Sequence, residues 1–220
     1  MEWFKGSQLK NLSGNGLTMS FKYDNNSIRT KKTVNGVETE YFYVGDTLVS
    51  QKTGNEVINF AYTAGGSPYG FTYNGTSYFY LTNIQGDIIG IYDSTGTVVV
   101  EYTYDSWGKL ISITGSLAST IGVKNPLRSR GYYYDTETSL YYLQARYYDP
   151  DTGRFISPDA LLVAGNDYIQ GMNRYAYCYN NPVMYSDPSG YSLKDTVKEI
   201  ICNAGVAFRS EEHTSELQSR

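Results

Sequence analysis

The chain has few of the residues from which most catalytic and metal sites are built. Its 220 residues include one histidine and two cysteines, Cys178 and Cys202. Two cysteines at this spacing match neither a disulfide framework nor a zinc pattern, so we expect both to be inert. Charge is sparse too: 18% of the residues are charged, the net charge is −4, and no basic stripe is present. This composition argues against a nucleic-acid partner.

Long apolar runs are also missing. No stretch approaches the roughly 18 consecutive apolar residues of a membrane-spanning helix, so we expect no membrane span. The opening residues, MEWFKGSQLKNLSG, contain no apolar signal core. If the protein is exported, we expect its signal on chain that precedes this sequence.

The C-terminal run 209–220 differs from everything before it. Residues 209–219, RSEEHTSELQS, have the sequence that a common short-read sequencing adapter encodes in one reading frame. We interpret the run as an artefact; the alternative is a natural disordered tail. On this interpretation the natural chain is interrupted near Phe208, and His213, the only histidine, is foreign to it. This excludes catalysis by Ser-His-Asp or Cys-His groups and metal sites with histidine ligands. We therefore expect no cofactor and no metal.

Tyrosine and glycine are abundant instead, with 24 and 22 residues. Aromatic side chains fit a pleated surface, so the composition favours β-structure. An Asp at the first position of a type I turn accepts hydrogen bonds from the backbone ahead of it, and Gly at the fourth position adopts a left-handed conformation. Each copy of a recurring aromatic-x-Tyr-Asp-x-x-Gly pattern therefore predicts a bulged hairpin turn. The copies are Tyr23-Asp24, Tyr92-Asp93, Tyr104-Asp105, Tyr134-Asp135 and Tyr148-Asp149.

Residues 20–114 are predicted to form successive β-hairpins. Asn35-Gly36 and Asn74-Gly75 are signals for two-residue turns. Alternation around residue 100 predicts one face with Val98, Val100, Tyr102 and Tyr104, and another with Val99, Glu101, Thr103 and Asp105. Each hairpin is too small to bury its own aromatic face. We therefore predict an all-β fold in which the antiparallel hairpins join into one long sheet that curls.

Two segments depart from this pattern. Residues 116–124 are small and polar, which predicts a loop. Within 192–208, the residues Leu193, Val197, Ile200 and Ile201 recur at helical spacing, which predicts the first helix of a further module. We accordingly divide the chain into a repeat sheet at 1–115, a Tyr-rich segment at 125–191, the start of a C-terminal module at 192–208, and the run 209–220.

Three runs carry a resemblance to a known family. They are YFYVGDTLVSQKTG (41–54), NIQGDIIGIYDSTGTVVVEYTYDSWGKL (83–110) and the Tyr-rich run 131–190. Through them the chain resembles the C-terminal part of tyrosine–aspartate (YD) repeat proteins of the Rhs (rearrangement hot spot) type. The segment 125–191 is similar to the core-associated segment of that family, and the resemblance covers most of residues 15–191.

The resemblance implies a sheet that spirals into a hollow shell, closed at one end by the core segment, with a variable toxin held inside. That toxin would follow residue 191. The implied partners are this toxin and the upstream repeats of the same chain, and an immunity protein would bind the toxin alone. The implied setting is bacterial competition by contact, in a secreted or cell-wall-associated protein.

In that family the core segment is similar to an aspartic autoprotease that cuts after its last Asp-Pro-x-Gly turn. By motif, the implied catalytic residues are Asp159, Asp187 and Arg154, and the implied cut lies between Tyr191 and Ser192. Paired carboxylates suit this chemistry, because one can keep a proton and act as an acid while the other activates water. The chain departs from the family pattern in two places: Tyr191 stands where Leu is common, and residue 160 is Ala where Pro is common.

Structural roles are the alternative for these residues. Asp159 and Asp187 can simply close turns. The arginines at 128, 130, 146 and 174 are expected to stack on tyrosine rings or to pair with turn carboxylates.

Two functions remain open at this point. One is a toxin shell that encloses its own effector and releases it by a single self-cleavage. The other is a surface module that binds carbohydrate or cell wall through exposed tyrosines, without catalysis. Tyrosines buried on one face of the sheet favour the first function, and exposed rows of tyrosine favour the second.

Overall fold

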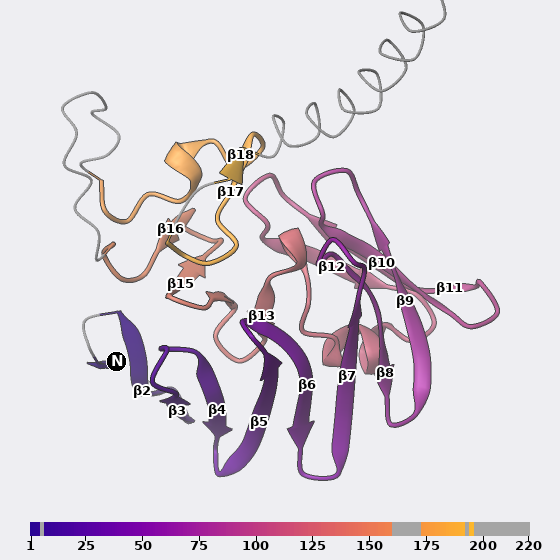
Figure 1. Cartoon of the computed structure of the whole chain (residues 1–220), viewed down its shortest axis with the longest axis horizontal. Helices are drawn as coiled ribbons and strands as arrows, with labels where there is room; N and C mark the ends of the chain where they lie inside the picture. Colours follow the sequence, from indigo (N-terminus) through magenta and orange to yellow (C-terminus); the bar gives the residue numbers. More distant parts are fainter. Residues whose placement is uncertain (5–6, 160–172, 192–193, 196–220) are drawn as a thin grey trace, which may run out of the picture.

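An antiparallel sheet of twelve strands, arranged in chain order, curls around the molecule (Figure 1). The computed structural model describes residues 1–4, 7–159, 173–191 and 194–195. The strands are β1 (Glu2–Phe4), β2 (Gln8–Gly14), β3 (Leu17–Tyr23), β4 (Arg29–Val34), β5 (Val37–Val44), β6 (Thr47–Thr53), β7 (Glu56–Tyr62), β8 (Pro68–Tyr73), β9 (Thr76–Thr82), β10 (Ile88–Asp93), β11 (Val98–Tyr104) and β12 (Leu110–Thr114). The prediction of an all-β fold with one long curled sheet is confirmed.

The turns between these strands form as the sequence predicts. At Asp93 the Oδ1 atom accepts the backbone N–H groups of Thr95 and Thr97 at 2.8 and 3.1 Å, and Gly96 has φ +84°. The same turn forms from Asp24, although Ser27 takes the left-handed position there with φ +70°. The two-residue turns at Asn35-Gly36 and Asn74-Gly75 have positive φ at both residues, as such hairpin turns require.

A β-bulge beside the Asp93 turn changes the faces predicted around residue 100. Ile91 pairs with Val100 and Tyr92 pairs with Val98, so Val99 is the extra residue. From Val100 onward the predicted alternation is confirmed, since Val100 and Tyr102 are buried. For Val98 and Val99 it is wrong: Val98 is exposed and Val99 is buried, because an extra residue inverts the alternation on one side of the bulge.

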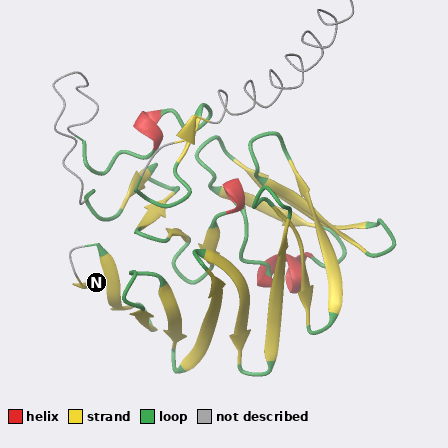
Figure 2. Cartoon of the chain, in the orientation of Figure 1, coloured by secondary structure: helices red, strands yellow, loops and turns green. Residues whose placement is uncertain are grey.

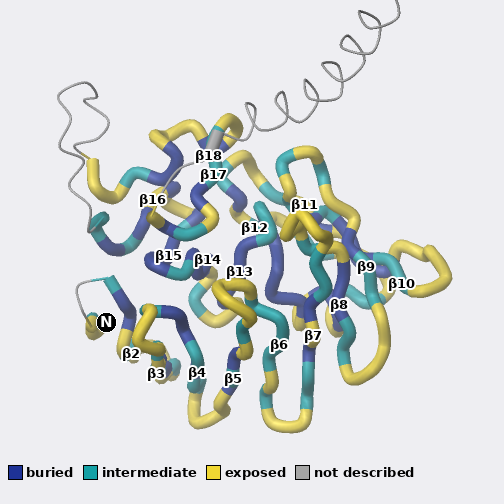
Figure 3. Tube along the Cα trace, in the orientation of Figure 1, coloured by how far each residue is buried: buried dark blue, intermediate teal, exposed yellow. Residues whose placement is uncertain are grey.

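A second antiparallel sheet lies inside the curve of the first (Figures 1 and 2). Its strands are β13 (Tyr133–Asp135), β14 (Leu140–Leu143), β15 (Arg146–Asp149) and β16 (Arg154–Phe155). Tyr133 meets the ring of Tyr41 edge-on at 5.5 Å, and Tyr147 meets Phe21 at 5.9 Å. The two sheets therefore share one aromatic core, and the buried residues line the facing sides of both (Figure 3).

Tyrosine hydroxyls tie neighbouring repeats of the first sheet together. Each of these hydroxyls is partly buried and donates to a backbone carbonyl of the preceding strand, at 2.8–2.9 Å. The pairs are Tyr23 with Leu9, Tyr43 with Arg29, Tyr62 with Leu48 and Tyr104 with Ile88. A phenol buried in an apolar sheet needs such a partner, so the repeated tyrosine supplies both packing and a bond.

The segment that links the two sheets is more ordered than the loop predicted for 116–124. It contains a turn of π-helix, η1 (Ala118–Gly122), followed by the short 3-10 turn η2 (Ser129–Gly131). A Cβ on Gly122 would lie 2.8 Å from a methyl group of Ile113 and 3.0 Å from one of Val100. Gly122 is thus required for close packing, although the small residues of this segment predict only a loop.

The remaining described elements are the 3-10 turn η4 (Cys178–Asn180) and a pair of short strands, β17 (Tyr185–Ser186) and β18 (Lys194–Asp195). The predicted helical residues Leu193, Val197, Ile200 and Ile201 lie outside the described residues, as do Cys202 and the run 209–220. Within the described parts, no helix is long and apolar enough to cross a membrane.

Candidate functional site

The structure brings Asp159 and Asp187 together on one guanidinium, that of Arg146. Nη2 of Arg146 lies 3.1 Å from Oδ2 of Asp159 and 3.3 Å from Oδ2 of Asp187. The side chains of Arg146 and Asp187 are 6% and 2% exposed, and that of Asp159 is 22% exposed. One carboxylate is therefore enclosed and the other is reached by water.

The turn Ser186–Gly190 holds Asp187 against the β14–β15 hairpin. The backbone N–H of Asp187 donates to the hydroxyl of Tyr132 at 2.9 Å, and that of Ala145 donates to the Ser189 carbonyl at 3.1 Å. Gly190 has φ +70° at the end of this turn. Its carbonyl accepts a hydrogen bond from Nε of Arg146 at 2.5 Å. Arg146, which contacts both carboxylates, thus also holds the backbone carbonyl of Gly190, three residues after Asp187.

Asp159 is held from the other side, by the chain around Arg174. The N–H groups of Phe155 and Asp159 donate to the carbonyls of Tyr175 and Arg174, each at 2.9 Å. The guanidinium of Arg174 donates back to the Asp159 carbonyl, with Nε at 2.8 Å. Residues 155–159 therefore run beside 174–175, which holds the backbone at Asp159 in place.

The guanidinium of Arg146 is itself fixed in place. Its central carbon lies 3.6 Å from the ring centroid of Phe155. Burial lowers the pKa of Arg146 from its ordinary value, while Asp159 and Asp187 act in the opposite direction. Arginine nevertheless remains charged, because its ordinary pKa lies so far above neutral. The site consequently holds one guanidinium and two carboxyl groups in a largely enclosed space.

Arg154, the arginine that the motif implies, lies elsewhere on the same sheet. It pairs with Asp149 across β15 and β16 and forms a bridge with Ala176, and it is exposed to solvent. The arginine that joins the two carboxylates is Arg146, to which sequence reasoning gave only a structural role. Strand alternation is the signal that could have found it, because it puts Arg146 and the core residue Tyr147 on opposite faces of β15.

The other residues of the expected site are less informative. Tyr191 is half-exposed, and its N–H donates to the Ser189 hydroxyl at 3.3 Å, whereas Ser192 lies outside the described residues. Cys178 is fully buried, and burial raises the pKa of its thiol to about 12, so the thiol stays protonated at neutral pH. No cluster of metal-ligating side chains occurs in the part of the chain that the structure describes.

A second charged cluster, which sequence reasoning missed, joins the two sheets. Arg29 of β4 is fully buried and lies 2.5 Å from Asp135 of β13, and Lys32 lies 2.9 Å from both Asp135 and Glu137. The rings of Tyr142, Tyr41 and Tyr133 surround the guanidinium at 4.3, 4.8 and 4.9 Å. The Asp135 carboxylate therefore pairs across the sheets, whereas those of Asp24, Asp93 and Asp105 hold their own turns.

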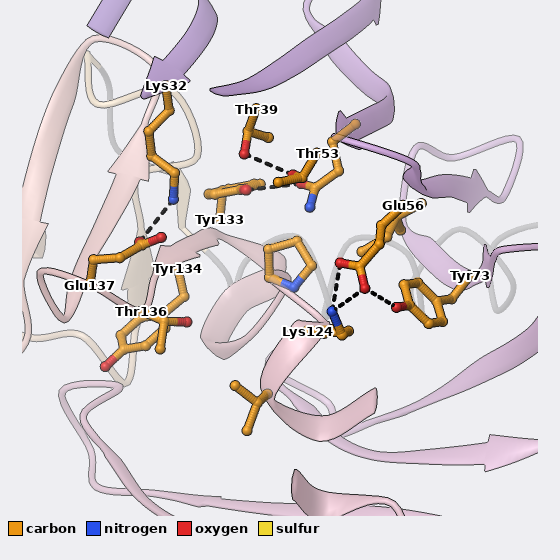
Figure 4. A pocket seen from close by; sticks show the side chains of 14 residues that line it. Lys32, Thr39, Thr53, Glu56, Tyr73, Lys124, Tyr133, Tyr134, Thr136 and Glu137 are labelled. Atoms are coloured by element: carbon orange, nitrogen blue, oxygen red, sulfur yellow. Dashed lines mark hydrogen bonds and ion pairs between the residues drawn. The ribbon is translucent and has the colours of Figure 1, made fainter. Parts of the chain in front are cut away.

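A cavity of about 360 Å³ lies next to this cluster, between the sheets (Figure 4). The Lys32–Glu137 pair lies at one end of it and the Lys124–Glu56–Tyr73 group at the other. These charged groups already have partners within the chain, so the cavity presents no unused charge to a ligand.

The tyrosines of the first sheet discriminate between the two functions left open by the sequence. Tyr41, Tyr80 and Tyr102 are buried on its inner side, and their hydroxyls or rings contact the second sheet or the linking segment. Buried rather than exposed rows of tyrosine favour the shell over a carbohydrate-binding surface.

Comparison with known proteins identifies this architecture. The family model described as Teneurin YD-shell matches residues 5–183. The chain belongs to the YD-shell family. The resemblance to the Rhs-type YD repeat proteins is thereby confirmed.

Relatives of this YD-shell chain include proteins named as toxins and nucleases. It is 43% identical over 192 residues to the tRNA nuclease WapA of Bacillus subtilis (strain 168). This alignment covers 86% of this chain and 8% of WapA. It is 45% identical over 65 residues to the toxin protein Tse5 of Pseudomonas aeruginosa, which covers 30% of this chain and 5% of Tse5. The chain thus spans less than a tenth of these relatives.

Solved structures show the same fold. The crystal structure of TcdB2–TccC3–TEV superimposes with a TM-score of 0.68 at 23% identity, over 86% of this chain and 10% of that one. The pore structure of the Photorhabdus luminescens Tc holotoxin gives 0.66 at 21% identity, with the same coverage. At this level of identity the likeness concerns the fold of the shell alone.

Proposed function

We propose that this chain is the closing end of a bacterial YD shell that encloses a toxic effector and releases it by cutting its own backbone once. The observation that carries the proposal is the junction of Asp159 and Asp187 on Arg146, beside the backbone of Gly190. The effector would follow residue 191 and any immunity protein would bind the effector. The toxin names of the relatives support a secreted or cell-wall-associated setting.

The proposed reaction is hydrolysis of the peptide bond between Tyr191 and Ser192. Asp159, which water reaches, takes a proton from a water molecule whose oxygen adds to the Tyr191 carbonyl carbon. Asp187, which is enclosed, gives a proton to the Ser192 nitrogen as the C–N bond breaks. The products are a carboxyl group on Tyr191 and a free amine on Ser192. Because the two catalytic carboxyl groups and the cut bond belong to one chain, a single turnover completes the reaction.

Intact-mass measurement of the purified 220-residue chain tests this proposal. We expect the parent chain to yield fragments 1–191 and 192–220, and both Asp159→Asn and Asp187→Asn to stay whole. Asp151→Asn is the matched control, because Asp151 is an exposed carboxylate whose ion pair is with Lys109. A parent chain that remains uncut after folding, or Asn variants that are cut like the parent, would contradict the proposal.

A further inference from the structure

Three Asn-Gly pairs form the tips of two-residue hairpin turns in the first sheet. They are Asn15-Gly16 between β2 and β3, Asn35-Gly36 between β4 and β5, and Asn74-Gly75 between β8 and β9. Both residues of each pair have positive φ, between +47° and +87°. All three asparagines are exposed, and a Cβ built on any of the three glycines would meet no atom within 4 Å. The three turns are therefore alike in conformation and in exposure.

Hydrogen bonds to a neighbouring hairpin distinguish two of these turns from the third. Oδ1 of Asn35 accepts the backbone N–H of Thr18 at 2.8 Å, and the N–H of Asn35 donates to the Thr18 carbonyl at 2.8 Å. Asn74 makes the same two bonds with Val57, at 2.9 and 3.0 Å. We call this pair of bonds the asparagine clamp. It fixes the backbone and the side chain of the asparagine together.

Asn15 has no asparagine clamp within the described residues. Neither its N–H nor its side-chain amide has a hydrogen-bond partner there. The clamp requires a strand that runs alongside the turn, as β3 does for Asn35. The strand next to β2 is β1, and its pairing extends only to Glu2, which lies opposite Asn11. No backbone group of β1 therefore lies beside the tip of the β2–β3 hairpin.

We infer that Asn15 is a site of spontaneous deamidation and that the asparagine clamp protects Asn35 and Asn74. In this reaction the nitrogen of Gly16 loses its proton to a base in the solvent and bonds to Cγ of Asn15. The bond from Cγ to the side-chain nitrogen breaks, and this nitrogen takes a proton from the solvent and leaves as ammonia. The product is a five-membered succinimide ring. Glycine favours the step, because no side chain shields its nitrogen.

Water then opens the ring in one of two ways. If the bond from Cγ to the Gly16 nitrogen breaks, Asn15 becomes aspartate; if the bond from the main-chain carbonyl carbon breaks, it becomes isoaspartate. The ring nitrogen regains its proton in both cases, so the net change consumes one water and releases one ammonia. Both products add a negative charge at neutral pH. Isoaspartate also inserts an extra backbone atom into a hairpin whose residues Met19 and Phe21 belong to the shared core.

The asparagine clamp opposes ring closure for a simple reason. The side chain must rotate until its Cγ approaches the nitrogen of the next residue. In Asn35 and Asn74 this rotation breaks the hydrogen bond to Oδ1, whereas in Asn15 it breaks none. A neutral hydrogen bond of about 1 kcal/mol corresponds to about 5-fold in rate. We therefore expect Asn15 to convert at least about 5-fold faster than either clamped asparagine.

Peptide mapping by mass spectrometry tests this inference on the folded 220-residue chain. Samples are taken at successive times at mildly alkaline pH, which speeds the reaction because the glycine nitrogen must lose a proton. Incubation in urea is the control: the clamps are lost with the hairpins, so all three Asn-Gly pairs should convert at similar rates. The proposed cut at Tyr191–Ser192 lies far along the chain from these pairs, so the test does not depend on it.

Thr18→Pro removes the N–H that Asn35 Oδ1 accepts and leaves the clamp of Asn74 in place. Asn35 should then convert about 5-fold faster, while Asn74 keeps its parent rate. Near-ultraviolet circular dichroism shows whether this variant is folded; if it is not, the folded and urea-treated parent decide the question. Equal rates for the three asparagines in the folded parent would overturn the inference. A difference that persists in urea would also overturn it, as would an unchanged rate at Asn35 in folded Thr18→Pro.

Discussion

Position 190 strongly favours glycine. Its φ of +70° is costly for side chains that carry a Cβ, and a Cβ there would meet the Leu143 carbonyl at 2.6 Å. Most left-handed glycines of this chain face open space instead, and Gly36, with φ +86°, is one of them. Gly190 therefore combines a conformation that would strain other residues with a close backbone contact at the candidate site.

Gly190→Ala is expected to destabilise the chain and to stop its self-cleavage. Backbone strain of this kind costs about 1–3 kcal/mol, and the clash with Leu143 adds to it. Gly36→Ala is the matched control: it carries strain without a clash and lies far from the site in sequence. Urea unfolding followed by tyrosine fluorescence measures the difference, and intact mass follows the cut. Equal destabilisation of the two variants would show that the close contact at Gly190 does not matter.

The residues of the candidate site differ in how far sequence could predict them. Asp159 and Asp187 could be predicted from the family motif, because each stands in a short, recognisable sequence. Their meeting point could not be derived, since it depends on contacts between residues far apart in the chain. Arg146 was missed because, beside Tyr147 and Tyr148, it looks like a residue of an aromatic strand. Strand alternation indicates its face, but only the folded sheet shows that it contacts both carboxylates.

At the scale of elements, the contact between the two sheets is secured by a buried ion cluster. Arg29 of β4 and Asp135 of β13 are both fully enclosed, and Lys32 adds a second positive charge. Burial alone raises the pKa of Asp135, but the charges of Arg29 and Lys32 outweigh it, and the pKa is lowered from its ordinary value. The carboxylate is thus ionised in the folded protein, and its stabilising contribution depends on that charge.

Asp135→Asn is expected to cost about 3–5 kcal/mol at neutral pH, because it leaves a buried guanidinium without its charge partner. The folded pKa of Asp135 is lowered, so its contribution is complete above the unfolded value of about 4 and is lost as pH falls toward the folded value. Thermal melts of the parent should therefore lose stability below about pH 4, and Asp135→Asn should lack this component of the loss. Glu38→Gln removes a partly exposed pair with Lys31 and should cost under about 1 kcal/mol. An Asp135→Asn chain as stable as Glu38→Gln would show that the cluster does not hold the sheets together.

The elements themselves were more predictable than their association. Turns such as Asp93–Gly96 and Asn35–Gly36 follow from local backbone chemistry, so the hairpins and their curled sheet were correctly predicted. The bulge at the Asp93 turn was predicted as well, but its effect on the faces of Val98 and Val99 was not. The π-helical turn 118–122 was not predicted, because it depends on the packing of Gly122 against Ile113 and Val100. The packing of the Tyr-rich segment inside the curled first sheet could not be predicted from the sequence either. It depends on contacts such as the Arg29–Asp135 pair, whose residues lie about a hundred positions apart.

At the scale of the whole molecule, tyrosine side chains form much of the buried core, a role that leucine and valine have in most proteins. The rings fill the space between the sheets, and hydroxyls such as those of Tyr23 and Tyr43 bind the carbonyls of earlier strands. The chain carries 24 tyrosines, many of them buried. Its stability is therefore tied to a group that ionises in alkali.

The YD-shell chain is accordingly expected to unfold cooperatively in alkali. Burial, above all, raises the pKa of Tyr23 and of Tyr43 to about 12. Because the folded pKa lies above the unfolded value of about 10, the contribution is complete below pH 10 and is lost as pH rises through 12. A two-unit difference corresponds to about 2.7 kcal/mol for each such tyrosine, so a few of them suffice to exceed the stability of a typical domain.

Absorbance at 295 nm and far-ultraviolet circular dichroism, recorded together against pH, measure this transition. The buried tyrosines should ionise in one step that coincides with loss of the β-sheet signal, whereas Tyr69 is exposed and serves as the control position. Tyr23→Phe, which removes one raised pKa, should make stability fall less steeply with pH above 10. Tyr69→Phe is the control and should leave that slope unchanged. Smooth ionisation of all tyrosines near pH 10 with an intact sheet would contradict the buried tyrosine core.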